Sequence, residues 1–221
     1  MAVDTLTLLE AADVIVASDE SGYGALAGPL VVGCVVAPKG WVPRATFTDS
    51  KKMTDAERRQ AASILIADER IFWMTLWAQA PEVDAENVYH ANIRLHTAAI
   101  EAGLVKAGIM FPGKTVASVV DGNLPIPGAR SLPKADRLVL ACSAASVIAK
   151  VAHDTWMVDK MDKEFPGFGF SRHVGYGTPE HLLALDSIGP CAIHRRSFSP
   201  VAERLRPVAQ SITSLMDDLE G

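Results

Sequence analysis

The chain is poor in cysteine, and the few cysteines that it has exclude two kinds of scaffold. Cys34, Cys142 and Cys191 form no CxxC pair, and their number is odd. Neither a disulfide framework nor a zinc site is therefore indicated. Two of the three lie in apolar runs, where a small buried thiol fits. We expect reduced cysteines and a cytoplasmic protein.

The chain also lacks a long hydrophobic run and a basic N-terminus. Its longest apolar stretch, residues 25–37, contains two glycines and a proline and is too short to cross a bilayer. A signal peptide would place Lys or Arg before its apolar run, whereas this chain begins with Asp4, Glu10 and Asp13. We expect a soluble protein that has no membrane partner.

An excess of basic residues, which is typical of nucleic-acid-binding proteins, is absent from a chain whose net charge is −5. The acids are concentrated at the ends, however. Residues 1–20 hold five acids and no Lys or Arg, and residues 207–221 hold three acids and none. Residues 21–206 therefore carry 18 acids and 21 bases, a net charge of +3. This distribution is compatible with a nucleic-acid partner.

No internal repeat, low-complexity tract or long Gly/Ser linker divides the chain, and 221 residues suffice for one domain with a full core. Short β-branched runs predict strands, whereas capping patterns and apolar periodicity predict helices. The expected strands are about 14–18, 30–36, 71–78 and 115–120, and the expected helices are about 54–68, 84–106, 143–161 and 179–188. Strands followed by strands alternating with helices indicate an α/β fold with a mixed sheet that begins with a hairpin.

Acidic residues follow two of the expected strands. Asp19 and Glu20 come directly after the first strand, and Asp121 directly after the fourth. If these strands are neighbours, three carboxylates meet at one edge of the sheet, where α/β proteins commonly bind ligands. Asp154 lies inside an expected helix, four residues after Lys150, so these two share one helix face.

Four carboxylates close together repel one another unless divalent cations supply positive charge. Oxygen-only ligation suits Mg²⁺ or Mn²⁺, and two such ions would activate a water and stabilise the leaving oxygen of a phosphodiester. Each acid alone also has a structural interpretation. Asp121 precedes glycine as turn residues do, Asp154 fits a solvated helix face, and adjacent Asp-Glu pairs are common on surfaces. A metal site is one hypothesis beside these.

The residues around the acids resemble the motifs of the ribonuclease HII family. Residues 17–30 are similar to its opening motif, in which Asp-Glu precedes a Gly-basic-Gly loop and a Gly-Pro strand start. Five further segments resemble family motifs in the same order: 49–52 (DSKK), 120–122 (VDG), 145–151 (ASVIAKV) followed by Asp154, 175–178 (GYGT) with His181, and 194–198 (HRRSF). The spacing matches from about residue 14 to 200.

The resemblance implies an RNase H-like fold, a mixed central β-sheet flanked by helices with a C-terminal helical extension. We expect a single domain over 1–221, with the core at about 10–165 and the extension at about 166–221, including a flexible tail after 207. The implied protein is a monomeric, metal-dependent endoribonuclease. It hydrolyses the RNA strand of RNA/DNA hybrids and cuts 5′ to ribonucleotides embedded in duplex DNA, leaving 3′-hydroxyl and 5′-phosphate ends. Its implied role is the removal of ribonucleotides from the genome.

The resemblance also implies roles for individual residues. The catalytic and metal-binding tetrad, holding two Mg²⁺ or Mn²⁺ ions, would be Asp19, Glu20, Asp121 and Asp154. The implied substrate-binding residues are Gly22, Tyr23, Gly24, Lys51, Ser146, Lys150, Tyr176 and Arg195. The glycines would let backbone N–H groups approach sugar and phosphate, where the 2′-hydroxyl identifies a ribonucleotide.

For four of these residues, a structural or solvent-exposed role is an alternative to substrate binding. Tyr176 matches the tyrosine that packs on the sugar beside the ribonucleotide, but a core tyrosine is the alternative. Lys51 and Lys150 match positions that face phosphate or the acids, although isolated lysines are usually solvated. Arg195 would contact phosphate, with a solvated basic turn as the alternative.

Three positions depart from the family pattern. Tyr23 stands where Arg or Lys is usual, which should weaken substrate binding by about 0.5–1 kcal/mol. Ala135 stands where Gly is usual. His153 stands where Arg usually precedes the last acid. A catalytic His153 is not expected, because adjacent helix residues point about 100° apart.

Two alternatives to the active nuclease remain. A catalytically weak hybrid-binding protein would account for Tyr23 and Ala135, but a binder gains nothing from four repelling carboxylates. Another RNase H-like nuclease would keep the chemistry and change the substrate. Ribonuclease HIII carries an N-terminal substrate-binding domain, for which we expect no room before Asp19.

Overall fold

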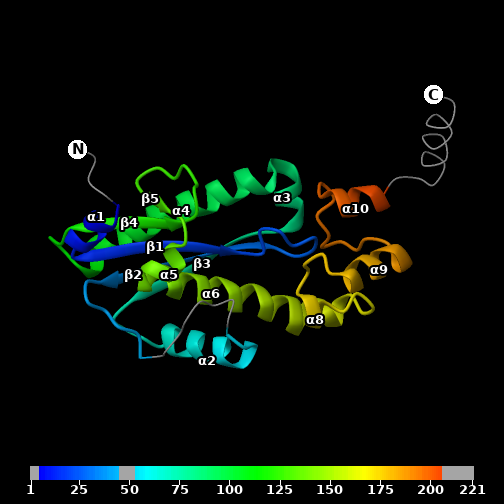
Figure 1. Ribbon diagram of the computed structural model, residues 1–221, viewed down its shortest axis with the longest axis horizontal. Coiled ribbons are helices and arrows are strands. Elements are labelled where there is room, and N and C mark those ends of the chain that lie inside the picture. Colours follow the sequence, from blue (N-terminus) through cyan, green and yellow to red (C-terminus); the bar gives the residue numbers. More distant parts are fainter. Residues whose placement is uncertain (1–4, 45–52, 206–221) are drawn as a thin grey trace.

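A mixed β-sheet forms the centre of the computed structural model, which describes residues 5–44 and 53–205. The strand order is β3-β2-β1-β4-β5. The strands are β1 (Val14–Ser21), β2 (Leu30–Pro38), β3 (Phe72–Ala78), β4 (Val116–Asp121) and β5 (Arg130–Leu132). β1 pairs antiparallel with β2 and parallel with β4 (Figure 1). The predicted α/β class, mixed sheet and opening hairpin are confirmed.

Helices cover both faces of the sheet. The longest, α4, lies on one face, and α6 with α2 lies on the other (Figure 1). The helices are α1 (Thr5–Ala11), α2 (Asp55–Ile66), α3 (Ala80–Glu86), α4 (Val88–Met110), α5 (Ala135–Leu138), α6 (Leu140–Trp156), the π-helical turn η2 (Met157–Met161), α7 (Asp162–Glu164), α8 (Phe170–His173), α9 (Pro179–Ile188) and α10 (Ser199–Arg204).

The alternation of side chains along β1 gives each face its own core. Val14 and Val16 pack toward α4, whereas Ile15 and Ala17 pack toward α6. Gly33 of β2 lets α6 approach closely, since a Cβ there would lie 2.4 Å from a backbone oxygen of α6. The C-terminal half of β1 therefore lies between α4 and α6, and both helices place polar side chains at this edge of the sheet.

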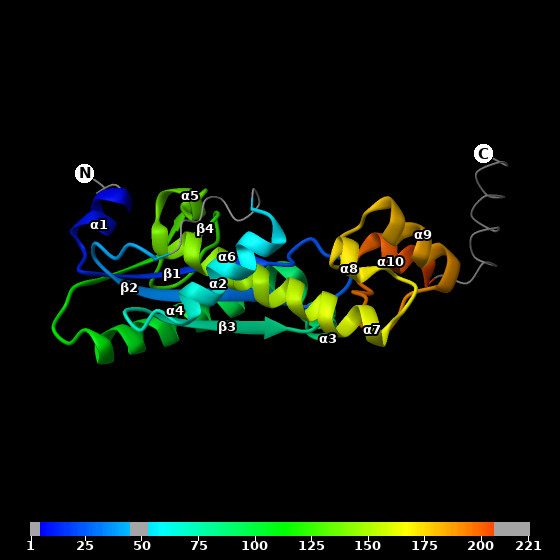
Figure 2. The ribbon, with the colours of Figure 1, turned by 90° about the horizontal axis from the view of Figure 1, so that it is seen from below.

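A third apolar cluster joins the C-terminal helices to the loop after β1. Phe168, Phe170, Leu185 and Val201 are buried together with Leu26 and Ala27 of that loop. Figure 2 shows α8, α9 and α10 gathered at one end of the molecule, opposite α1. The C-terminal extension therefore packs directly on residues that follow Asp19 and Glu20.

Several predicted boundaries are wrong, and the causes are local. The predicted helix 84–106 is two helices, because Asn87 takes a left-handed φ of 74° and caps α4 through a 2.8 Å bond to the Tyr89 N–H. β1 continues to Ser21, so Asp19 lies inside the strand. The predicted helix 143–161 begins at Leu140 and changes to a π-helical turn after Trp156.

The short elements α1, β5, α5, α8 and α10 were not predicted. Among the described residues, no helix is both long enough and apolar enough to span a membrane. Lys51, the DSKK motif around it and the tail after 207 lie outside the described ranges.

Candidate active site

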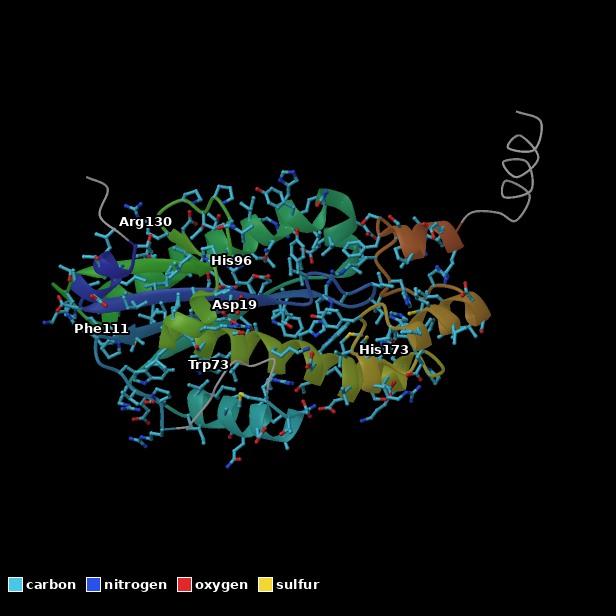
Figure 3. The ribbon with its side chains drawn as sticks, in the orientation of Figure 1. Asp19, Trp73, His96, Phe111, Arg130 and His173 are labelled. Carbon is cyan, nitrogen blue, oxygen red and sulfur yellow. The ribbon has the colours of Figure 1, made fainter. Side chains whose placement is uncertain are left out.

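Three of the four predicted acids come together where β1 and β4 end. Ser18 pairs with Val120 in the parallel register, so the next step places Asp19 beside Asp121. Successive strand residues face opposite sides, so Asp19 faces α6 and Glu20 faces α4. Figure 3 shows Asp19 near the middle of the molecule with His96 of α4 nearby.

An open pocket of about 400 Å³ lies at this edge of the sheet. It brings together residues from β1, β4, α6, the loop after β1 and the segment before α9. Its lining residues are Asp19, Glu20, Ser21, Gly22, Tyr23, Gly24, Asp121, Ser146, Lys150 and Tyr176. Nine of these ten are predicted site residues, which had been scattered along the sequence.

Asp19 is the most buried of the pocket carboxylates, with 6% of its surface exposed. One of its oxygens accepts the backbone N–H of Glu20 at 2.8 Å. Burial, followed by the charges of Glu20 and Asp121, raises the pKa of Asp19 well above its ordinary value, against an opposing hydrogen bond from Ser146. Ionised Asp19 is therefore an electrostatically unfavourable group in this fold.

Glu20 is held from the opposite helix by a residue that the sequence reasoning missed. Its Oε2 lies 3.4 Å from Nε2 of His96, which is fully buried. The other ring nitrogen of His96 lies 2.8 Å from the Ser18 hydroxyl. A histidine inside the apolar face of a predicted helix was the available signal, but nothing in the sequence pairs it with Glu20.

Asp121 receives hydrogen bonds from the backbone N–H groups of Ala135 and Asp136. Burial, and then the charges of Asp136 and Glu20, nevertheless raise its pKa. Its Oδ1 is buried and has no hydrogen-bond partner among the described residues. Asp136, itself 7% exposed, is a fifth acid near the site that the sequence reasoning did not select.

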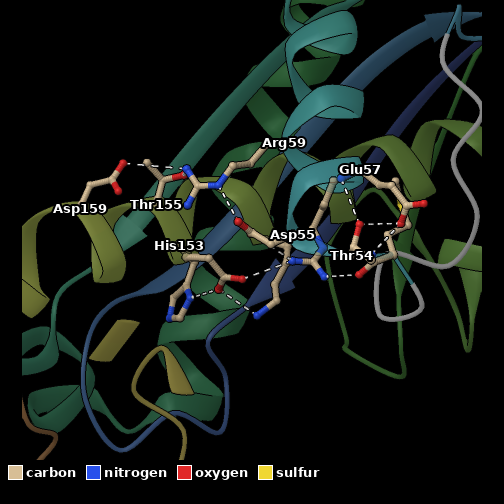
Figure 4. A network of polar contacts seen from close by, with 11 residues as sticks. Thr54, Asp55, Glu57, Arg59, His153, Thr155 and Asp159 are labelled. Atoms are coloured by element: carbon tan, nitrogen blue, oxygen red, sulfur yellow. Dashed lines mark hydrogen bonds and ion pairs between the residues drawn. The ribbon is translucent and has the colours of Figure 1, made fainter. Parts of the chain in front are cut away.

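Asp154 is absent from the residues that line the pocket, and three donors contact it. Lys150 Nζ and His153 Nδ1 lie 2.8 and 2.9 Å from Oδ1, and Arg58 Nη1 lies 3.6 Å from Oδ2. Burial would raise the pKa of Asp154, but the hydrogen bonds from His153 and Lys150 keep it below its ordinary value. Figure 4 shows this network, which Arg58 extends from Asp154 to Asp55 of α2.

The four predicted metal ligands therefore form a group of three and a separate residue. Within residues 5–44 and 53–205, no three His, Cys, Asp or Glu side chains are arranged so that they could hold a metal ion as they stand. Asp154 is neutralised by Lys150 and Arg58. Glu20 instead lies beside His96, and burial and neighbouring acids raise the pKa of Asp19 and Asp121.

The loop after β1 contributes backbone to the pocket. Gly22 has a left-handed φ of 83°, and a Cβ there would lie 2.5 Å from the Pro29 carbonyl oxygen. At Gly24 a Cβ would meet no atom within 4 Å, so the space beside it is open. Tyr23, between them, is 38% exposed at the pocket rim. Only glycine fits at 22, and the backbone at 24 is accessible.

Tyr176 and Lys150 lie together on the wall of the pocket. The Tyr176 hydroxyl accepts the Gly22 N–H at 3.2 Å. Lys150 Nζ lies 5.2 Å from the centre of the Tyr176 ring, a cation–π distance. The side chain of Lys150 thus links the tyrosine to Asp154.

Arg195 is fully buried and does not line the pocket. Its Nε donates to the Gly28 carbonyl and its Nη1 to the Tyr23 carbonyl, each at 3.0 Å. The alternative of a solvated turn is therefore wrong for Arg195 and for His194, which is 1% exposed. The guanidinium contacts the backbone of the loop between β1 and β2, residues 22–29, which we call the glycine loop.

A buried histidine pair fixes the segment that carries Tyr176. His181 Nδ1 lies 3.0 Å from the Tyr176 carbonyl, which can only accept, so Nδ1 carries the proton. His181 Nε2 then accepts from His194 Nε2 at 3.0 Å, and His194 Nδ1 accepts the Cys191 N–H. His173 stacks on His181. Burial lowers the pKa of both His181 and His194 to about 4, so both are neutral at pH 7.

Solved structures with the same fold are ribonucleases. Ribonuclease H2 from Pyrococcus horikoshii superposes with a TM-score of 0.65 at 23% identity, covering 86% of this chain and 96% of that one. Bst-RNase HIII, solved in complex with Mn²⁺, superposes with a TM-score of 0.65 at 17% identity, covering 90% and 72%. The predicted RNase H-like fold is confirmed.

Sequence comparison is more specific than the fold. The family model described as Ribonuclease HII matches residues 16–201. The chain is 40% identical over 197 residues to a ribonuclease HII of Halorhodospira halophila, covering 86% of this chain and 94% of that protein. It is 38% identical over 188 residues to a ribonuclease HII of Myxococcus xanthus, of which it spans 61%. The chain belongs to the ribonuclease HII family, whose members are endoribonucleases of the ribonuclease H type.

Replacing Asp19 with Asn should stabilise the protein when divalent cations are absent. A group whose pKa is raised by folding makes the folded state less stable once it ionises, and Asn removes that charge. We expect the free energy of unfolding at neutral pH in EDTA to rise by on the order of 1 kcal/mol. Excess MgCl₂ should stabilise the wild type and have little effect on D19N. Urea denaturation measures both.

The matched control for this experiment is Glu101→Gln on the exposed face of α4, which should leave the free energy of unfolding and its response to MgCl₂ unchanged. A loss of stability in D19N without cations, or an equal response to MgCl₂ in D19N and wild type, would contradict the electrostatic account of Asp19.

The His181–His194 pair should make stability fall as the pH is lowered. A histidine whose pKa is lowered by folding contributes stability above its unfolded pKa, and this is lost as pH falls toward the folded value. With folded pKa values of about 4, each histidine of the pair should cost on the order of 3 kcal/mol of stability between about pH 7.5 and about pH 4. Urea denaturation in the D19N background, which removes the opposing titration of Asp19, measures the slope.

His194→Gln should flatten the dependence of stability on pH, and His90→Gln, at an exposed position in α4, should not. Equal slopes in H194Q and its parent would show that the pair is not neutral in the fold.

Proposed function

We propose that this endoribonuclease hydrolyses the RNA strand of RNA/DNA hybrids and cuts on the 5′ side of ribonucleotides embedded in duplex DNA. The products would have 3′-hydroxyl and 5′-phosphate ends, and the role would be the removal of ribonucleotides from DNA. One observation carries the proposal: three carboxylates, a glycine loop and Tyr176 share one pocket. The carboxylates suit phosphodiester hydrolysis, and the loop and tyrosine suit recognition of a ribose.

The carboxylates fit hard divalent cations. Asp121 Oδ1 is buried without a partner among the described residues, and burial followed by like charges raises the pKa of Asp19, so both carboxylates would gain from a cation. We propose that Asp19, Glu20, Asp121 and Asp154 hold two Mg²⁺ or Mn²⁺ ions. When bound, such ions supply a water of lowered pKa and stabilise negative charge on the leaving oxygen.

Asp154 would join this site only when Lys150, His153 and Arg58 release it. In the structure Lys150 supplies positive charge to Asp154 and also lines the pocket. We propose that the same ammonium turns to a substrate phosphate when substrate binds. Ser146 would orient Asp19 through its hydroxyl and need not touch the substrate.

Tyr176 and the glycine loop would read the ribose. The Tyr176 hydroxyl accepts from Gly22, so its own O–H is available to donate to the 2′-hydroxyl oxygen. The open space at Gly24 would let the sugar approach the backbone. Tyr23 provides a rim contact without the positive charge usual at this position, so substrate binding should depend less on salt at that point.

We further propose a monomer that acts in the cytoplasm. Cys34, Cys142 and Cys191 are all free thiols, and two of them are buried, which suits a reducing compartment. The proposed partner is nucleic acid.

A cleavage assay tests the proposed substrate. It compares a duplex with one ribonucleotide, a continuous RNA/DNA hybrid and an all-DNA duplex, each with Mg²⁺ and with Mn²⁺. The first two should be cut and the third should not. Asp121→Asn should lower kcat by at least about 100-fold because it removes a ligand carboxylate. Asp186→Asn, the same substitution at an exposed position in α9, should change kcat less than about twofold.

Each failure of this assay has its own meaning. Cutting of all-DNA at a similar rate would favour another RNase H-like nuclease. Tight binding of hybrids without cutting would favour the catalytically weak binder. Undiminished cutting by D121N would remove the metal-site assignment.

A further inference from the structure

Arg195 joins the two ends of the glycine loop although it lies outside the pocket. Its guanidinium donates to the Tyr23 carbonyl at one end and to the Gly28 carbonyl at the other. The guanidinium carbon lies 5.3 Å from the centre of the Phe198 ring, and the whole side chain is excluded from solvent. Burial of a charged group is costly unless it is hydrogen-bonded, so these contacts offset the cost of burying the guanidinium.

The backbone around Arg195 pairs with the same loop. The Arg195 N–H donates to the Leu26 carbonyl at 2.8 Å, and the Gly28 N–H donates to the Ile193 carbonyl at 2.9 Å. On the other side of the loop, the Leu26 N–H donates to the Gly175 carbonyl at 2.8 Å. The loop is therefore held between the segment before α9 and the segment before α10.

The segment that carries Arg195 is itself anchored at two places. Asp84 accepts the backbone N–H groups of Arg196 and Ser197 at 2.8 and 2.9 Å. His194 is bonded to His181, which in turn contacts the Tyr176 carbonyl. Arg195 thus projects from a fixed base, and it has little freedom to swing toward a phosphate.

The bond from Arg195 to the Tyr23 carbonyl sets the direction of the next N–H. Tyr23 C=O and Gly24 N–H belong to one trans peptide unit, in which the two groups point in opposite directions. Since the carbonyl points inward to Arg195, the Gly24 N–H points away from it. Gly24 lines the pocket, and no backbone carbonyl of the described residues accepts from its N–H.

We propose that Arg195 is a positioning residue, which turns the Tyr23–Gly24 peptide so that the Gly24 N–H faces the pocket and thereby sets the preference for ribose over deoxyribose. This inference rests on the proposed function, because it assigns to Arg195 the geometry of the ribose reader. It replaces the phosphate contact that the sequence suggested for this residue.

The test measures the affinities of Arg195→Met for two duplexes that differ by a single 2′-hydroxyl, with Ca²⁺ to prevent cutting. Met is a long unbranched side chain that cannot donate. The ratio of Kd values, all-DNA over ribonucleotide duplex, should fall by about tenfold, because the pocket no longer has a fixed donor. The Kd for all-DNA and the slope of log Kd against log salt should stay as in the wild type.

Two controls separate positioning from other roles. Arg195→Lys keeps the charge but reaches only one of the two carbonyls, so its Kd ratio should lie between those of wild type and R195M. If R195M does not fold, Arg195→Lys alone provides the comparison with the wild type. Arg196→Met, at the exposed neighbouring position, should keep the wild-type ratio.

The outcomes are distinct. If Arg195 bound a phosphate, its replacement would weaken binding of both duplexes equally and reduce the salt slope by about 0.9 for that phosphate. A purely structural role would lower the active fraction and leave the ratio unchanged in both Arg195 variants. Either result overturns the proposal. If the wild type itself shows no preference between the duplexes, the proposed function fails instead.

Discussion

The parallel pairing of β1 and β4 is the constraint on which the site depends. It delivers Asp19, Glu20 and Asp121 to one edge of the sheet, where burial and mutual repulsion raise the pKa of Asp19 and Asp121. Repulsion between the carboxylates disfavours this arrangement, whereas strand pairing, helix packing and hydrogen bonds stabilise it. A divalent cation would turn the same repulsion into binding energy, because it would supply positive charge to these carboxylates. Asp154, by contrast, is already neutralised by Lys150 and its neighbours.

The C-terminal extension stabilises the loop that follows β1 at the same edge of the sheet. Its apolar cluster packs on the loop after β1, and its polar residues fix that loop from two sides. Tyr176 reaches Gly22 directly, whereas Arg195 holds the loop by its carbonyls. The neutral His181–His194 pair joins the two contacting segments to each other. In the proposed function, the carboxylates at the sheet edge would supply the chemistry, and the C-terminal extension would position the loop that contacts the ribose.

The sequence predicted four of the five strands, the major helices and nine of the ten pocket residues, because motifs and apolar periodicity are local properties. It did not predict contacts that depend on tertiary packing. His96 could be recognised as unusual in an apolar helix face, but its pairing with Glu20 requires the crossing of α4 over β1. Arg195 looked like a basic turn residue, since nothing in HRRSF shows that its second residue is buried. The position of Asp154 outside the pocket follows from Lys150, His153 and Arg58, three residues on two helices whose packing no motif encodes.

The most direct measurement of the central claim is crystallographic location of the cations by anomalous diffraction from crystals containing Mn²⁺. We predict anomalous peaks bounded by the carboxylates of Asp19, Glu20 and Asp121, with Asp154 drawn away from Lys150 toward them. An empty pocket at saturating Mn²⁺, or peaks confined to other acids on the surface, would contradict the account.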